Sequence, residues 1–419
     1  MTSVNPNAKQ KKIKPPKSRP LATSALSQPV TQTQQAGTLA TLAAFSPKAN
    51  HFALLSLAVD RHRLRVYDTA TAQANAEYIV EPARATCLHW MEIHSDPAQA
   101  QKKKKKKKRD SAASNTEKPK TQVVALGLSS GAITFFSPAH GSPILTLSNP
   151  ASNTAILDAA LDADEDRLWT SSEDASICLW DMSSSTILRT WKSEDRIPYT
   201  CISLEPRVMD ESDRPVGLLA AHNAAKLLSI NLSSESASSK PTIFASFSGH
   251  TTPISHIAWT TSKQFVTVAQ GDKFVQGWTM PKNGGVGTVA FSAALDAEAR
   301  KAYVSPNGEL IVATSLSGAI SIFRIPSQYI PASNLAPESV VNISIARGKG
   351  LAENADVIDA VFSTDSPGLI HVARIIAGVR PAFETVVCPL PAHSYSPHTN
   401  LLFSSPSWTT RGMLFQKSN

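Results

Sequence analysis

One segment of the 419-residue chain has the composition to bind phosphate groups. Seven consecutive lysines, Lys102 to Lys108, are followed by Arg109. A run of cations neutralises several backbone phosphates at once, which gives sequence-independent binding of nucleic acid that weakens steeply with salt. No aromatic side chain interrupts the run, so stacking on single-stranded bases is not indicated. The predicted nucleic-acid-binding residues are Lys102, Lys103, Lys104, Lys105, Lys106, Lys107, Lys108 and Arg109.

The same run has two other interpretations, a nuclear or nucleolar targeting signal and a solvated loop without a partner. Targeting and RNA contact are compatible with each other. A second basic cluster near the amino terminus is typical of nuclear-import signals, with Lys9, Lys11, Lys12 and Lys14 as the predicted targeting residues. We therefore expect the protein in the nucleus and nucleolus.

Side chains suited to catalysis or metal binding show no recognisable spacing. The histidines His51, His62, His89, His94 and His140 are scattered along the chain. Asp162 to Asp166 resembles the start of a calcium loop but lacks the glycine and glutamate that such a loop needs, so a solvated turn is expected. Gly284 to Gly287 follows no strand-to-helix pattern, and we expect a flexible interstrand loop there. The sequence predicts no enzyme, no cofactor and no metal.

Four cysteines are widely spaced and form no Cys-x-x-Cys pair: Cys87, Cys178, Cys201 and Cys388. This pattern favours reduced, buried thiols in an intracellular protein over disulfides or a zinc motif. No run of 18 apolar residues occurs, so neither a signal peptide nor a membrane span is expected. The net charge of +8 comes from residues 1–20 and 95–120, which leaves the body of the chain mildly acidic.

The elements that must carry these segments are indicated by an aspartate six residues before a tryptophan, which occurs twice. Asp174 precedes Trp180, and Asp272 precedes Trp278 downstream of Gly249-His250. Both spacings are typical of WD40 repeats, in which the aspartate lies in the turn between the second and third strands of a blade. Val268 stands where the repeat that contains Asp272 and Trp278 would need Ser or Thr. The predicted structural network is Thr170, Asp174, Trp180, His250, Asp272 and Trp278.

Short apolar runs separated by turn residues extend from about residue 38, which predicts an all-β fold. Seven repeats can be laid out, so we expect a WD40-type β-propeller of seven blades. The weakest is the seventh, with strands at 357–362, 369–373 and 385–388. The predicted domains are a disordered basic tail at 1–37, the propeller at 38–390 with a lysine-rich loop inserted at 95–120, and a Ser/Pro-rich tail at 391–419.

The order of motifs resembles one family more specifically. Leu168 to Asp181 is followed by Phe247-Ser-Gly-His-Thr-Thr-Pro-Ile-Ser255, and a late segment, Val357 to Val387, follows the basic stretch Arg347 to Gly350. Over about residues 38–390 this resembles the propeller of the family called Utp-five or WD-repeat protein forty-three. Family members continue into a helical assembly domain, whereas this sequence stops at Asn419, so functions of that domain are not carried over.

The resemblance implies a non-enzymatic subunit of the UtpA (t-UTP) subcomplex of the small-subunit processome. Such a subunit supports transcription of pre-ribosomal RNA and processing of pre-18S rRNA. The implied partners are other propeller subunits and the 5′ external transcribed spacer of pre-rRNA, with no membrane and no small-molecule substrate. The alternative is a WD40 adaptor, such as a ubiquitin-ligase substrate receptor or a chromatin-associated scaffold.

Overall fold

The computed structural model divides between Leu39 and Ala40, and the residues that it describes all belong to the second unit, Ala40–Asn419. They are 41–57, 62–94, 120–162, 164–193, 195–206, 217–222, 226–231, 242–261, 263–316, 318–325, 339–343, 355–365, 368–376 and 380–387. In this described part no helix has the length and apolarity to cross a membrane.

The described strands form seven sheets, each built mainly from antiparallel strands that follow one another in the sequence. Blade 1 contains β1 (Thr41–Phe45), β2 (His51–Leu57), β3 (His62–Asp68) and β4 (Ala74–Val80). Blade 2 contains β5 (Ala85–His94), β6 (Lys120–Leu128), β7 (Ala132–Ser137) and β8 (Ser142–Ser148). Blade 3 contains β9 (Ile156–Asp162), β10 (Arg167–Ser172), β11 (Ser176–Asp181) and β12 (Thr186–Lys192). Blade 4 contains β13 (Tyr199–Leu204), β14 (Gly217–His222), β15 (Lys226–Asn231) and β16 (Thr242–Ser248).

The remaining three blades follow the same order. Blade 5 contains β17 (Ile254–Thr261), β18 (Gln264–Ala269), β19 (Phe274–Thr279) and β21 (Thr288–Ala294), and β20 (Gly285–Val286) is an extra short strand. Blade 6 contains β22 (Ala299–Val304), β23 (Leu310–Ser315), β24 (Ile320–Arg324) and β25 (Ser339–Ile343). Blade 7 contains β26 (Ala355–Phe362), β27 (Leu369–Ile376) and β28 (Arg380–Val387).

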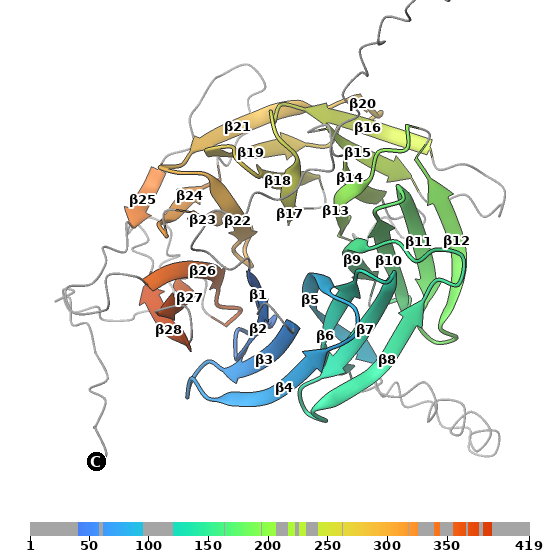
Figure 1. Cartoon of the computed structure of the whole chain (residues 1–419). Helices are drawn as coiled ribbons and strands as arrows, with labels where there is room; N and C mark the ends of the chain where they lie inside the picture. The colour runs from blue at the N-terminus through green and yellow to red at the C-terminus, as the bar shows by residue number, and fades with distance from the viewer. Residues whose placement is uncertain are drawn as a thin grey trace, which may run out of the picture. The chain divides into compact units, whose positions relative to one another are not determined.

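The seven sheets stand around a common axis with the first strand of each innermost, as Figure 1 shows. Each first strand contacts the first strands of both neighbouring blades, including β1 with β26. The fold is therefore a seven-bladed β-propeller, which confirms the predicted all-β class and the seven repeats. In blade 7 the third strand begins at Arg380, five residues before the predicted start, because its first half mixes polar and apolar residues.

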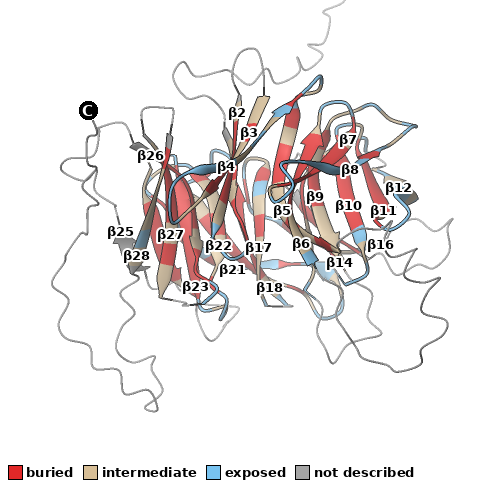
Figure 2. Ribbon diagram, turned by 90° about the horizontal axis from the view of Figure 1, so that it is seen from below, coloured by how far each residue is buried: buried red, intermediate tan, exposed pale blue. Residues whose placement is uncertain are grey.

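The core consists of apolar clusters between neighbouring blades, and the buried surfaces are visible in Figure 2. The middle strands are covered on both faces; every residue of β23 is buried. The outer strands bury one face only, as in β8, where most side chains are exposed. This gradient from centre to rim follows from packing sheet against sheet around an axis.

The ring is closed between blades 7 and 1 by side-chain packing. The rings of Phe45 and Phe52 meet edge-to-face at 4.8 Å, and Phe383 of β28 lies 5.4 Å from Phe52. Phe52 is fully buried. Because aromatic pairs bury a large apolar area in a defined geometry, they hold the first and last blades together.

The glycine-rich segment at Gly284–Gly287 contradicts the expectation of a flexible loop. It contains β20, which runs parallel to β16 of blade 4 and so attaches blade 5 to its neighbour. A Cβ atom on Gly287 would lie 2.0 Å from the ring of Phe247, so only glycine permits this close approach. The glycines serve backbone packing between blades.

Candidate functional site

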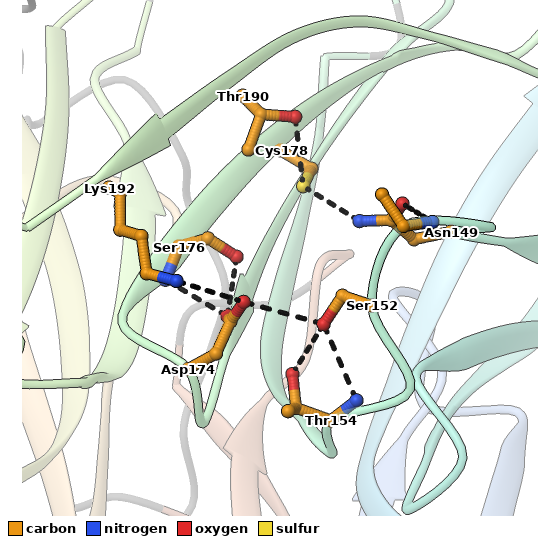
Figure 3. A network of polar contacts seen from close by, with 9 residues as sticks. Asn149, Ser152, Thr154, Asp174, Ser176, Cys178, Thr190 and Lys192 are labelled. Atoms are coloured by element: carbon orange, nitrogen blue, oxygen red, sulfur yellow. Dashed lines mark hydrogen bonds and ion pairs between the residues drawn. The ribbon is translucent and has the colours of Figure 1, made fainter.

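The turn of blade 3 between β10 and β11 is ordered by Asp174, as Figure 3 shows. Its carboxylate accepts hydrogen bonds from the amide and hydroxyl of Ser176, at 3.2 and 2.6 Å, and from the hydroxyl of Ser152 at 3.3 Å. Burial acts to raise the pKa of Asp174, but the bonds from Ser176 and the charge of Lys192 lower it overall. Asp174 is thus an ionised turn-ordering residue.

Two further side chains complete the blade 3 network. The indole of Trp180 donates to Thr170 Oγ1 at 2.9 Å, and both residues are buried. Cys178 lies near Asn149 and Thr190 in the same region, and burial raises the pKa of its thiol. A buried, protonated thiol behaves as a small apolar group.

Blade 5 holds a longer relay of hydrogen bonds. His250 Nδ1 is 2.8 Å from Asp272, and its Nε2 is 2.7 Å from Thr267 Oγ1. Thr267 also accepts from Trp278 Nε1 at 2.7 Å, and Thr251 donates to Asp272 at 2.7 Å. Tryptophan can only donate and an ionised carboxylate can only accept, which sets the direction of the relay.

The direction of the relay determines the state of His250. Its Nδ1–H donates to Asp272 and its Nε2 accepts the Thr267 hydroxyl proton, which is the neutral imidazole. Burial lowers the pKa of His250 more than Asp272 raises it, in agreement with that state. The His250 side chain is fully buried, so it orders the blade and has no access to a substrate.

The expectation that Val268 occupies the serine or threonine position was wrong, because Thr267 fills it. Thr267 lies two residues beyond Phe265, which pairs with Trp278, just as Thr170 lies two beyond Leu168, which pairs with Trp180. The turn between the second and third strands contains six residues in blade 5, between the paired residues Val268 and Val275. It contains five in blade 3, between Ser171 and Ile177. Because of this longer turn, the threonine lies five residues before the aspartate in blade 5 and four residues before it in blade 3.

A ring of polar side chains around the axis was missed by the sequence analysis. In blades 2 to 7 the first strand carries a β-bulge near its start. The residue after each bulge occupies an equivalent position on the innermost strand, because the bulge re-aims the strand in the same way. These residues are Cys87, Asp158, Cys201, His256, Lys301 and Asp359.

Asp158 joins three blades. It accepts a hydrogen bond from the amide of Ile202 in blade 4 at 2.7 Å, and it lies 2.5 Å from His89 Nε2 in blade 2. Burial acts to lower the pKa of His89, but Asp158 raises it to about 10. The carboxylate of Asp158 therefore stabilises the protonated form of His89.

Asp359 takes the same position in blade 7. It lies 3.6 Å from the ammonium of Lys301 and 3.4 Å from the hydroxyl of Tyr303, both in blade 6, and it accepts the amide of Phe45 in blade 1. Burial raises its pKa more than these groups lower it. The two aspartates thus tie blades 2, 3 and 4, and blades 6, 7 and 1.

The sequence held a signal for both carboxylates. Leu157-Asp158-Ala159 and Ile358-Asp359-Ala360 place an aspartate between apolar residues at the same point of the first strand. A carboxyl group in a buried strand needs partners, which here come from the two neighbouring blades.

The predicted nucleic-acid-binding residues, Lys102–Arg109, and the predicted targeting residues, Lys9 to Lys14, lie outside the described residues. The flanking strands show where the lysine-rich segment joins the propeller, since β5 ends at His94 and its antiparallel partner β6 begins at Lys120. His94 lies 3.4 Å from Asp166, in the turn between the first two strands of blade 3. The segment therefore leaves the ring face that carries the turns between first and second strands, opposite the turns of Asp174 and Asp272.

The turn at Asp162–Asp166 has its own structural use. The Asp162 carboxylate accepts the amides of Asp164 and Glu165, at 3.2 and 3.3 Å, and Asp166 adopts a positive φ. These contacts are those of a self-capped hairpin turn.

Two comparisons with known proteins bear on this architecture. The family model "WD domain, G-beta repeat" matches residues 241–279, which contain β16 to β19 and the blade 5 relay. The chain is also similar to WD repeat-containing protein 43 of Homo sapiens, at 26% identity over 223 residues. The match covers 52% of this chain and 29% of the human protein, so it spans less than a third of that relative. The predicted resemblance is confirmed as a distant similarity.

Proposed function

We propose that this chain, a WD40 repeat protein with distant similarity to human WD repeat-containing protein 43, is a non-catalytic scaffold of ribosome biogenesis. In this role it is a nucleolar subunit of the UtpA subcomplex of the small-subunit processome. It binds other propeller subunits through its blade faces and pre-rRNA through its basic segments. The observation that carries the proposal is the similarity over 223 residues.

The fold and the buried polar groups both support a scaffold role. WD40 propellers are typically non-catalytic platforms for protein binding, with loops that vary on a rigid ring. The polar groups found here are committed to structure: the His250 relay is buried, and both axial aspartates bond to neighbouring blades. The binding capacity therefore lies in the loops and the basic extensions.

Purification of the endogenous tagged protein, with and without nuclease, tests the proposal. We expect other large propeller proteins in both samples, and the 5′ external transcribed spacer of pre-rRNA in the untreated sample only. Recovery of ubiquitin-ligase or chromatin subunits without pre-rRNA would contradict the proposal and place the protein among WD40 adaptors.

The lysine run is tested separately in vitro. Replacing all eight residues Lys102–Arg109 by glutamine should weaken RNA binding and flatten the dependence of log affinity on log salt. Replacing the seven lysines by arginine is the matched control, because it keeps the charge and should keep both quantities. Equal RNA affinity for the glutamine and arginine variants would exclude phosphate binding by this run.

A further inference from the structure

Three side chains at the propeller axis bring different metal-ligating atoms together. Cys87 and His89 of β5 and Asp158 of β9 each offer one donor atom, and these atoms all lie within 4.8 Å of one another. Cys87 and His89 are two residues apart on a strand, so they lie on the same face. Asp158 joins them because it holds the equivalent position to Cys87 in the next blade.

A fourth donor comes from the following blade. Cys201 of β13 occupies the equivalent position in blade 4, and its thiol interacts with Asp158. Its sulfur lies outside the group of three close donor atoms, so it moves inward when it completes the site. Cys87, Asp158 and Cys201 are each less than 10% exposed. The blade repeat therefore directs two thiols and an imidazole to one buried carboxylate, as Figure 1 illustrates by the neighbouring positions of β5, β9 and β13.

We propose that Cys87, His89, Asp158 and Cys201 form a zinc site that joins blades 2, 3 and 4. Thiolate, imidazole and carboxylate are the ligands that Zn²⁺ takes, and four of them satisfy its tetrahedral geometry. Ligand atoms around a tetrahedral ion lie about 3.3 to 3.8 Å apart, given bond lengths of about 2.0 to 2.3 Å. His89 and Asp158, now 2.5 Å apart, separate by about 1 Å to admit it.

The protons balance in this exchange. Thiol and imidazolium ligands give up their protons to solvent as Zn²⁺ binds, so no other acceptor is required. Asp158 is already oriented by the amides of Ala159 and Ile202, at 2.9 and 2.7 Å. Such outer contacts fix a metal-ligating carboxylate in position. The site lacks a short sequence motif because its ligands come from three blades.

Zinc titration of the purified full chain tests the proposal. After chelator treatment we expect one Zn²⁺ bound per chain, with a dissociation constant measured by competition against a chromophoric chelator. Cys87→Ser and Cys201→Ala should each lower the affinity by about 100-fold or more, since even outer-shell substitutions cost about 10- to 100-fold. Substituted Co²⁺ should show a thiolate-to-metal charge-transfer band in the wild type, reduced in both variants.

Cys178→Ser is the matched control, because Cys178 is equally buried but lies in β11 between Asn149 and Thr190. Its zinc affinity should equal that of the wild type. Circular dichroism of each variant in excess chelator establishes that the fold is retained, and a variant that fails this check is replaced by His89→Asn. Absence of zinc uptake by the wild type, or an equal loss in Cys178→Ser, would overturn the proposal and leave an ion pair that only fastens the blades.

Discussion

The two buried threonines of blades 3 and 5 offer a matched test of how the blade networks contribute to stability. Thr170 and Thr267 are both fully buried, and both accept the indole N–H of a tryptophan. Thr267 also donates to His250. Valine has nearly the same shape as threonine, so Thr→Val at either site removes the hydroxyl without opening a large cavity.

The expected losses follow from the polar atoms left without a partner. Thr170→Val leaves only the Trp180 N–H unbonded, whereas Thr267→Val leaves the Trp278 N–H and the acceptor nitrogen of His250. A buried polar atom without a partner costs about 1–3 kcal/mol. We therefore expect a loss of about 1.5 kcal/mol in the free energy of unfolding for Thr170→Val and about 3 kcal/mol for Thr267→Val.

Urea unfolding followed by circular dichroism measures both losses, provided that the slope with denaturant is unchanged. The comparison within one protein cancels the general cost of placing valine in a strand. A loss for Thr267→Val no greater than that for Thr170→Val would refute the relay assignment, and with it the neutral state of His250.

Three other substitutions test separate joints of the ring. Phe52→Ala should cost about 3–5 kcal/mol of unfolding free energy, because it removes a buried ring that packs on Phe383; a thermal melt within error of the wild type would contradict closure by packing. Gly287→Ala should cost about 1–3 kcal/mol in the same melt by forcing a methyl group into Phe247, unless β20 is not docked in solution. The lowered pKa of His250 makes the folded state bind fewer protons than the unfolded state below pH 6.5, so stability should fall as pH decreases from about 6.5. His250→Gln should reduce that slope in urea titrations at several pH values, and an unchanged slope would contradict the assignment.

Inner and middle strands can be recognised in the sequence because buried strands appear as apolar runs. Outer strands such as β4 and β8 are harder to recognise, since most of their side chains are exposed. The glycine-rich β20 was missed because its stability comes from pairing with β16 in another blade. Propensity within a segment carries no information about such a partner.

The polar side chains also differ in whether their partners are local in sequence or lie in another blade. The bonds of Asp174 to Ser176 and of Trp180 to Thr170 lie within one hairpin and follow from spacing. The position of Thr267 was predicted wrongly because the blade 5 turn is one residue longer. The axial ring was missed because equivalent positions in different blades become neighbours only when the ring closes. Asp158 and Cys201 are 43 positions apart in sequence, so no local motif joins them.

The polar contacts that stabilise the blades are distributed unevenly around the ring. Asp158 ties blades 2 to 4 and Asp359 ties blades 6, 7 and 1, so blade 5 lies outside both carboxylate clamps. Blade 5 is also the blade with the full relay from Trp278 to Asp272. The relay therefore stabilises blade 5 from within, in addition to its contacts with blade 4 through β20 and through the bond from Thr200 to the Ile254 carbonyl.

This division predicts where a weakened propeller opens first. In Thr267→Val, amide hydrogen exchange should accelerate in β17, β18 and β19, while β10 and β27 keep the protection they have in the wild type. Local opening follows the least stable unit, and loss of the relay removes the internal polar contacts of blade 5. Exchange measured by mass spectrometry on peptides from each blade resolves this. Equal acceleration in all blades would mean that the ring opens as one cooperative unit and that the axial clamps do not partition it.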